Sequence, residues 1–194
     1  MEVKLTIALF LWPKDFMTAE RFDAILNLAD KIRSISTDGS YPVDVNLIVA
    51  KLGGVFFFKK EKEVGLDQYV STIKITEPHK FEVLMLSLDE KKDLSNRVEI
   101  ARCLGYLFLH TKYVDGGAPE VCTVYPRSIL SPPDVDVFAM ALLMPKDHFL
   151  EIAEKNMIRS KYNVEMLSDY FKVPAYFVRN YGQYLGSYRW NKDA

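Results

Sequence analysis

The residues that could carry chemistry lie on one predicted helix, over residues 96–113. Apolar residues recur there at spacings of three and four, which is the pattern of a helix buried along one side. Arg102 and Tyr106 are four residues apart and therefore share a face, and Cys103 follows the first of them. Zinc peptidases present two histidines to one metal at this spacing. The sequence predicts the geometry of a metal-binding helix, with Arg and Tyr where the ligands would stand.

Other metal-binding residue types are present, so a relocated site is an alternative. The candidates are Cys103, Cys122, His110, Asp134 and Asp136. Cys103 and His110 are seven residues apart, which corresponds to about 10.5 Å of helical rise. A cysteine nucleophile must lie within hydrogen-bond distance of its histidine, so this spacing excludes a direct pair. A non-standard metal site of cysteine and aspartate stays open, and with it a hydrolase of the peptidase class.

The composition indicates a globular chain without a strong electrostatic field. Its 194 residues are 49% hydrophobic and 26% charged, and the formal net charge is −1. This balance gives no general attraction for nucleic acid or for an anionic membrane, and no apolar run reaches the roughly 18 residues of a membrane span. Two cysteines are too few for a disulfide framework, which favours a cytoplasmic location. We expect residues 1–16 to add a packed strand.

The elements that must position the candidate residues have helical and strand patterns in turn. Helices are predicted over residues 18–34, with Thr18 as cap, and over 42–52, from Pro42 to a stop at Gly53 and Gly54. Strand patterns at 55–58, 69–75 and 81–88 predict a three-stranded antiparallel sheet. The second half is expected to hold a short strand at 121–125 and helices at 134–144, 147–158, 164–172 and 174–185. This order predicts the α+β class.

Two segments, RVEIARCLGYLFLH and DVDVFAMALLMP, resemble the ImmA/IrrE metallopeptidase-like family in order, spacing and flanks. In that family a helix with a His-Glu-x-x-His motif precedes a helix that ends in a sequence similar to FAMALLMP. The family's helix, Pro-Val-Asp turn and second helix before the sheet are similar to the upstream segments ILNLADKIRS and YPVDVNLIVAKLGG. Its C-terminal helical pair is similar to the downstream segment LSDYFKVPAYFVRNYGQYLG. The resemblance covers roughly residues 22–186. It implies a zincin-like fold in which a small antiparallel sheet packs on a central helix, with a metallopeptidase-like domain over 1–160 and a C-terminal helical subdomain over 161–194.

The family's metal-binding and catalytic residues are missing from the matching positions. The two metal-binding histidines correspond to Arg102 and Tyr106, the general-base glutamate to Cys103, and the third metal ligand to Pro132. A guanidinium stays charged and repels a metal cation, proline has no donor atom, and a catalytic zinc needs three protein ligands. The resemblance therefore implies a degenerate member that binds neither a metal nor another cofactor.

We expect Arg102 to replace the positive charge of the metal. A carboxylate within reach would form a charge-assisted hydrogen bond with it, and Asp134 and Asp136 lie on the second helix of the former site. The sequence predicts that Arg102 pairs with one of these aspartates, with Tyr106 in the same network.

The predicted C-terminal helical pair allows two interpretations. It could form a DNA-binding helix-turn-helix, but its second helix offers only Arg179 as a basic residue, whereas phosphate contacts need several. Tyrosine and tryptophan are common anchors of protein interfaces. We therefore favour a partner-binding surface over direct DNA binding, and expect it to consist of Tyr176, Arg179, Tyr181, Tyr184, Tyr188 and Trp190.

The expected function follows from the resemblance. Members of the family commonly act on helix-turn-helix repressors of mobile elements and stress responses, or are encoded beside them. The resemblance implies a pseudoenzyme that binds such a regulator stoichiometrically, as an antirepressor or co-regulator.

Overall fold

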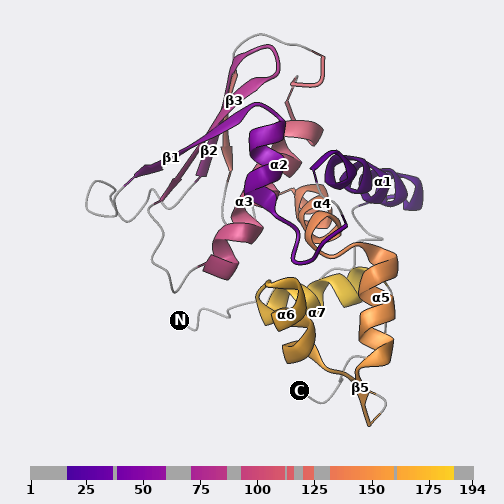
Figure 1. The fold of residues 1–194 in the computed structure, drawn as a ribbon. Coiled ribbons are helices and arrows are strands. Elements are labelled where there is room, and N and C mark those ends of the chain that lie inside the picture. The colour runs from indigo at the N-terminus through magenta and orange to yellow at the C-terminus, as the bar shows by residue number, and fades with distance from the viewer. Residues whose placement is uncertain are drawn as a thin grey trace, which may run out of the picture.

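The computed structural model describes residues 17–36, 39–59, 71–86, 93–111, 113–115, 120–124, 132–159 and 161–185. Over these residues the chain is of the α+β class and mostly helical, with a four-stranded sheet and a two-stranded hairpin. Figure 1 shows the sheet on one side of the molecule and the helices α1, α2, α3 and α4 beside it. The helices α5, α6 and α7 form a group below them. The strand predicted over residues 1–16 lies outside the described residues.

The predicted helices and strands occur in the predicted order, with some ends shifted, and the short strands β5 and β6 were not predicted. The helices are α1 (Ala19–Ser36), α2 (Val45–Lys51), α3 (Asp93–Leu109), α4 (Pro133–Leu143), α5 (Lys146–Lys155), α6 (Val164–Phe171) and α7 (Ala175–Tyr184). The strands are β1 (Gly54–Lys59), β2 (Ser71–Glu77), β3 (Lys80–Leu86), β4 (Glu120–Val124), β5 (Met157–Ile158) and β6 (Lys161–Tyr162). The helix predicted over 147–158 is shorter than expected, because its last two residues form strand β5, which pairs with β6.

Side-chain caps explain where the first two helices begin. The Thr18 hydroxyl accepts a hydrogen bond from the Arg21 amide at 3.2 Å, so the predicted cap of α1 is confirmed. The prediction that α2 begins at Pro42 is wrong, because the Asp44 carboxylate accepts hydrogen bonds from the amides of the first turn and sets a later start. Gly53 then ends α2 with φ +81°.

The predicted antiparallel sheet is wrong in one pairing. β2 pairs antiparallel with β3 and with β4, but β1 runs parallel to β3, with Gly54 opposite Phe81. The strand order is β1-β3-β2-β4, so β3 lies between the two strands that precede it in the chain. An alternating pattern identifies a strand but carries no information on the direction of its neighbour.

One core joins the sheet to the helices. The buried face of the sheet presents Ile73, Ile75, Phe81, Val83 and Met85. Every residue of α4 from Val137 to Leu143 is buried, because this helix lies between α1 and α3. None of the described helices is long and apolar enough to cross a membrane.

Candidate functional site

The two helices of the candidate site approach each other closely at a glycine. A Cβ on Gly105 of α3 would lie 3.2 Å from Cγ1 and from the carbonyl oxygen of Val135, and 3.3 Å from the ring of Phe138. These distances are tighter than ordinary van der Waals contact, so a Cβ at position 105 would require its neighbours on α4 to shift by a few tenths of an ångström. The close approach brings the polar side chains of α3 and α4 within reach of one another.

Arg102 lies at the centre of this contact and is almost fully buried, with 3% of its surface exposed. Its Nε donates a hydrogen bond to Oδ1 of Asp136 at 2.6 Å, so the predicted pairing is present. Its Nη1 lies 3.9 Å from Oε2 of Glu99, one turn earlier on α3. Burial opposes the charged guanidinium, but the charge and hydrogen bond of Asp136, together with Tyr176 and Glu99, outweigh it and raise the pKa of Arg102.

Glu99 extends the cluster to the sheet. Its Oε1 accepts a hydrogen bond from the Ser71 hydroxyl of β2 at 3.1 Å. Burial raises the pKa of Glu99, while Arg102 and Ser71 act in the opposite direction. We call Ser71, Glu99, Arg102 and Asp136 the buried polar network; it connects the sheet, α3 and α4. The sequence analysis did not predict Glu99, although its position three residues before a candidate arginine is a usable signal.

Asp134, the other predicted partner of Arg102, binds different residues. Its two carboxylate oxygens contact Nη2 of Arg21 and Nε2 of His110, each at 2.9 Å. Burial favours the neutral form, but the hydrogen bonds to His110 and Arg21 outweigh it and lower the pKa of Asp134. Tyr106 is buried and its ring lies 5.6 Å from that of His110. Whether Tyr106 belongs to the buried polar network stays a prediction.

The other positions that the resemblance assigns to a metal site carry no ligand set within the described residues. Cys103 is fully buried and is not part of a disulfide among the described residues, and Pro132 precedes α4 as its N-cap residue. No group of three or more His, Cys, Asp or Glu side chains that could hold a metal ion occurs in the part of the chain that the structure describes. The side chain of Cys122 lies outside that part, although the backbone of this residue belongs to β4.

The predicted tyrosine surface is wrong for Tyr181. This side chain is completely buried, and its hydroxyl has no hydrogen-bond partner among the described residues. Tyr176 and Tyr184 are half-buried, and burial together with the charge of Asp136 raises the pKa of Tyr184 to about 12. Arg179 is exposed as predicted. Tyr188 and Trp190 lie outside the described residues.

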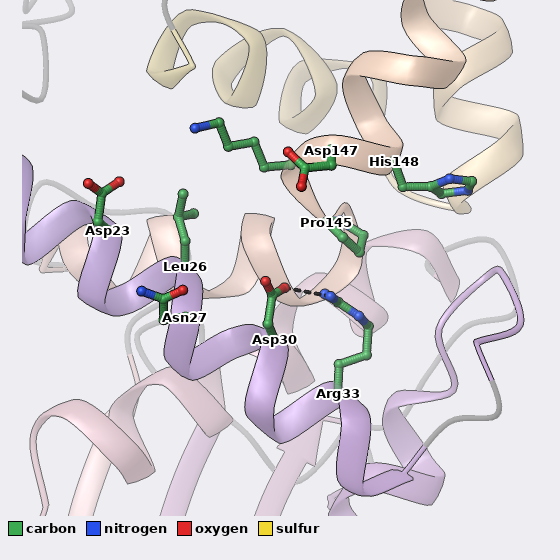
Figure 2. Close-up of a pocket in the computed structure, with 9 residues that line it drawn as sticks. Asp23, Leu26, Asn27, Asp30, Arg33, Pro145, Asp147 and His148 are labelled. Carbon is green, nitrogen blue, oxygen red and sulfur yellow. Dashed lines mark hydrogen bonds and ion pairs between the residues drawn. The ribbon is translucent and has the colours of Figure 1, made fainter.

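A polar pocket of about 470 Å³ lies between α1 and the start of α5. It is lined by Asp23, Leu26, Asn27, Asp30, Arg33, Pro145, Lys146, Asp147 and His148. Figure 2 shows Asp23, Asn27 and Asp30 along α1, across from Asp147, with Asp30 paired to Arg33. This pocket was not predictable from local sequence patterns, because its two walls are more than one hundred residues apart in the chain.

His148 fixes one end of this pocket to the C-terminal helices. Its ring stacks on Tyr41, with the centroids 4.2 Å apart, and its Nε2 lies 3.0 Å from the hydroxyl of Tyr170 on α6. Its Nδ1 lies 3.6 Å from a carboxylate oxygen of Glu151. The imidazole therefore serves as a structural contact between α5, α6 and the loop before α2.

Comparison of the chain with protein-family models, with curated proteins and with solved structures yields no match.

Proposed function

We propose that this protein is a catalytically inactive relative of the ImmA/IrrE metallopeptidases, with a zincin-like fold, and that it acts in the cytoplasm by binding a helix-turn-helix repressor-type regulator. One observation carries the proposal. Arg102, which stands where the resemblance expects a metal-binding histidine, is buried and hydrogen-bonded to Asp136 at 2.6 Å. The position is thus filled by a permanent cation whose charge is already balanced by a protein carboxylate.

The chemistry of the neighbouring positions supports the same conclusion. Cys103 is completely buried, and a thiol in apolar surroundings is a small hydrophobe rather than a reactive group. Pro132 cannot supply a third ligand. The buried polar network instead holds the sheet, α3 and α4 together, so the residues of the former site have a structural use. Such a protein would influence its regulator by stoichiometric binding, as an antirepressor or co-regulator.

The pocket between α1 and α5 supports a docking site for a basic side chain of the regulator. Asp30 is paired with Arg33, whereas Asp23 and Asp147 are exposed at the two walls. A repressor carries lysines and arginines on the surface that contacts DNA phosphates. Carboxylates at the pocket would complement the charge of that surface. Binding of the regulator to this protein would then compete with its binding to operator DNA.

The test is a binding experiment with the helix-turn-helix regulator encoded nearest to this protein's gene. We expect a complex of defined stoichiometry by light scattering, an intact regulator by mass spectrometry, and no change when a chelator is added. Asp23→Lys should weaken the complex at least about tenfold, because like charges that meet across an interface cost several kcal/mol. Asp169→Lys, at a site on α6 that is also exposed, is the matched control and should bind normally.

Two results would overturn the proposal. The first is cleavage of the regulator that the chelator abolishes. The second is stoichiometric zinc that stays with the purified protein through dialysis, since either result assigns a working metal site to the chain.

A further inference from the structure

Strand β1 forms an edge of the four-stranded sheet and carries an unusual set of exposed side chains. Within the described residues its only strand neighbour is β3. Val55, Phe57 and Phe58 are 55%, 48% and 53% exposed, although each is a large apolar residue. Natural edge strands usually carry charges, proline or a bulge that prevents pairing with another chain. From Gly54 to Phe58 this strand has none of these, and in the part of the chain that the structure describes no further strand pairs with this edge.

The ladder with β3 determines which backbone groups of β1 face outward. The amide of Phe81 donates to the carbonyl of Gly53, and the parallel register continues from Gly54 opposite Phe81. In a parallel pair alternate residues of one strand bond to its neighbour. Gly53, Val55 and Phe57 therefore direct their N–H and C=O groups to β3. The groups of Gly54, Phe56 and Phe58 point to the open edge.

We propose that a second copy of this chain pairs with β1 in antiparallel fashion, about a twofold axis at Phe56. In this register Phe56 faces Phe56 of the partner subunit, and Gly54 faces Phe58 of the partner subunit. All three outward-facing residues then exchange both of their backbone hydrogen bonds. An axis at Phe57 would also keep the faces of the two sheets aligned, but it would leave Gly54 beyond the end of the partner's strand.

The side chains agree with the register at Phe56. Val55 lies opposite Phe57 of the partner subunit on the outer face, a cross-strand pair of a β-branched and an aromatic residue that stabilises sheets. On the other face, the rings of Phe56 and Phe58 already stack, with centroids 6.2 Å apart and an interplanar angle of 16°. Lys59 falls outside the paired segment. The occupant is thus a copy of the same strand, because its apolar residues complement themselves.

The first experiment measures mass in solution by light scattering over a range of concentrations. We expect wild type to approach twice the monomer mass of 22.3 kDa. Phe57→Lys should remain a monomer, because it places a charge in the paired segment. Val121→Lys is the matched control, since Val121 is 63% exposed on β4 at the opposite edge of the same sheet, and this variant should still dimerise.

The second experiment tests the register by disulfide formation in a Cys122→Ser background, with Val55→Cys and Phe57→Cys made as separate proteins. Each new cysteine would be displaced by two positions, about 6.8 Å along the strand, from the same cysteine in the partner subunit. Added to the spacing between strands, this distance is too long for a disulfide. Only the mixture of the two proteins should therefore give a covalent dimer under mild oxidation.

Several results would overturn the proposal. A wild-type protein that stays monomeric at all concentrations would do so, as would a dimer that survives Phe57→Lys but is lost in Val121→Lys. Covalent dimers from either cysteine protein alone would contradict the register. Protection of the Phe56 and Phe58 amides from hydrogen exchange in a monomer would assign the edge to another segment of the chain.

Discussion

Replacement of Arg102 by methionine tests the buried polar network directly. Methionine keeps most of the apolar stem and removes the guanidinium, so Asp136 loses its 2.6 Å hydrogen bond and Glu99 loses its neighbouring positive charge. Loss of one partner of a buried ion pair typically costs about 3–5 kcal/mol. The side chains of Asp136 and Glu99 are still 23% and 15% exposed and keep some hydration. We therefore expect the lower end, about 3 kcal/mol of unfolding free energy.

The loss should depend on pH in a defined direction. Burial already raises the pKa of Glu99 above its ordinary value of 4.5, and removal of Arg102 takes away the charge that opposes this shift. A carboxyl group with a raised pKa in the folded state favours folding below its unfolded pKa and loses that contribution as the pH rises. The difference between wild type and Arg102→Met should therefore be larger at pH 7 than at a pH near 4.5.

The assay is denaturant unfolding at both pH values, combined with a double-mutant cycle. Asp136→Asn made together with Arg102→Met should cost less than the sum of the two single changes, by at least about 1 kcal/mol. Lys80→Met is the control, because its ion pair with Glu77 is exposed and is worth less than about 1 kcal/mol. Additive single effects, or a loss no larger than that of Lys80→Met at both pH values, would refute the role assigned to the network.

Three further predictions concern the helix contact, the buried tyrosine and the positions that the resemblance assigns to a metal site. Gly105→Ala should destabilise the fold by about 1–3 kcal/mol in thermal or denaturant unfolding, because its Cβ would crowd Val135 and Phe138; an unchanged stability would show that α4 moves away freely. Tyr181→Phe should leave stability unchanged or raise it by up to about 1 kcal/mol, since it removes a buried hydroxyl without a partner; a loss above about 2 kcal/mol would indicate a hydrogen bond to an ordered water. The combination Arg102→His, Cys103→Glu, Tyr106→His and Pro132→Glu should create a zinc site detectable by metal analysis, and failure to bind any zinc would mean that these positions do not form the ligand shell of the family.

Much of the helical part could be predicted from local patterns. The apolar spacing along α1, α3 and α4 identifies the buried side of each helix without knowledge of which element covers it. The Thr18 cap depends only on contacts within one helical turn. The pairing of Arg102 with Asp136 was predictable for a different reason. A buried arginine requires a carboxylate, and the helix that follows offers two.

The sheet and the tyrosine surface show what local patterns leave out. The parallel pairing of β1 with β3 and the contact of Ser71 with Glu99 depend on strand register between distant segments. Tyr181 was predicted as an interface residue from its type. Its spacing of four from Phe177, which is also buried, places it on the core side of α7. Residue type indicates what a side chain can do, whereas the helical period indicates which way it faces.

Because β3 lies between β1 and β2, the sheet cannot assemble in the order of the chain. β2 and β3 follow one another through a tight turn at His79 and can form a hairpin from local contacts alone. The pairing of β1 with β3 instead joins residues 27 positions apart, Gly54 and Phe81, and that of β2 with β4 joins residues 49 positions apart, Ile73 and Cys122. Contacts between distant residues form more slowly, because longer loops must close first. The hairpin should therefore be the earliest part of the sheet, and β4, which has the longest loop to close, should pair last. The aromatic strand β1 pairs between these two steps and is exposed to aggregation until then.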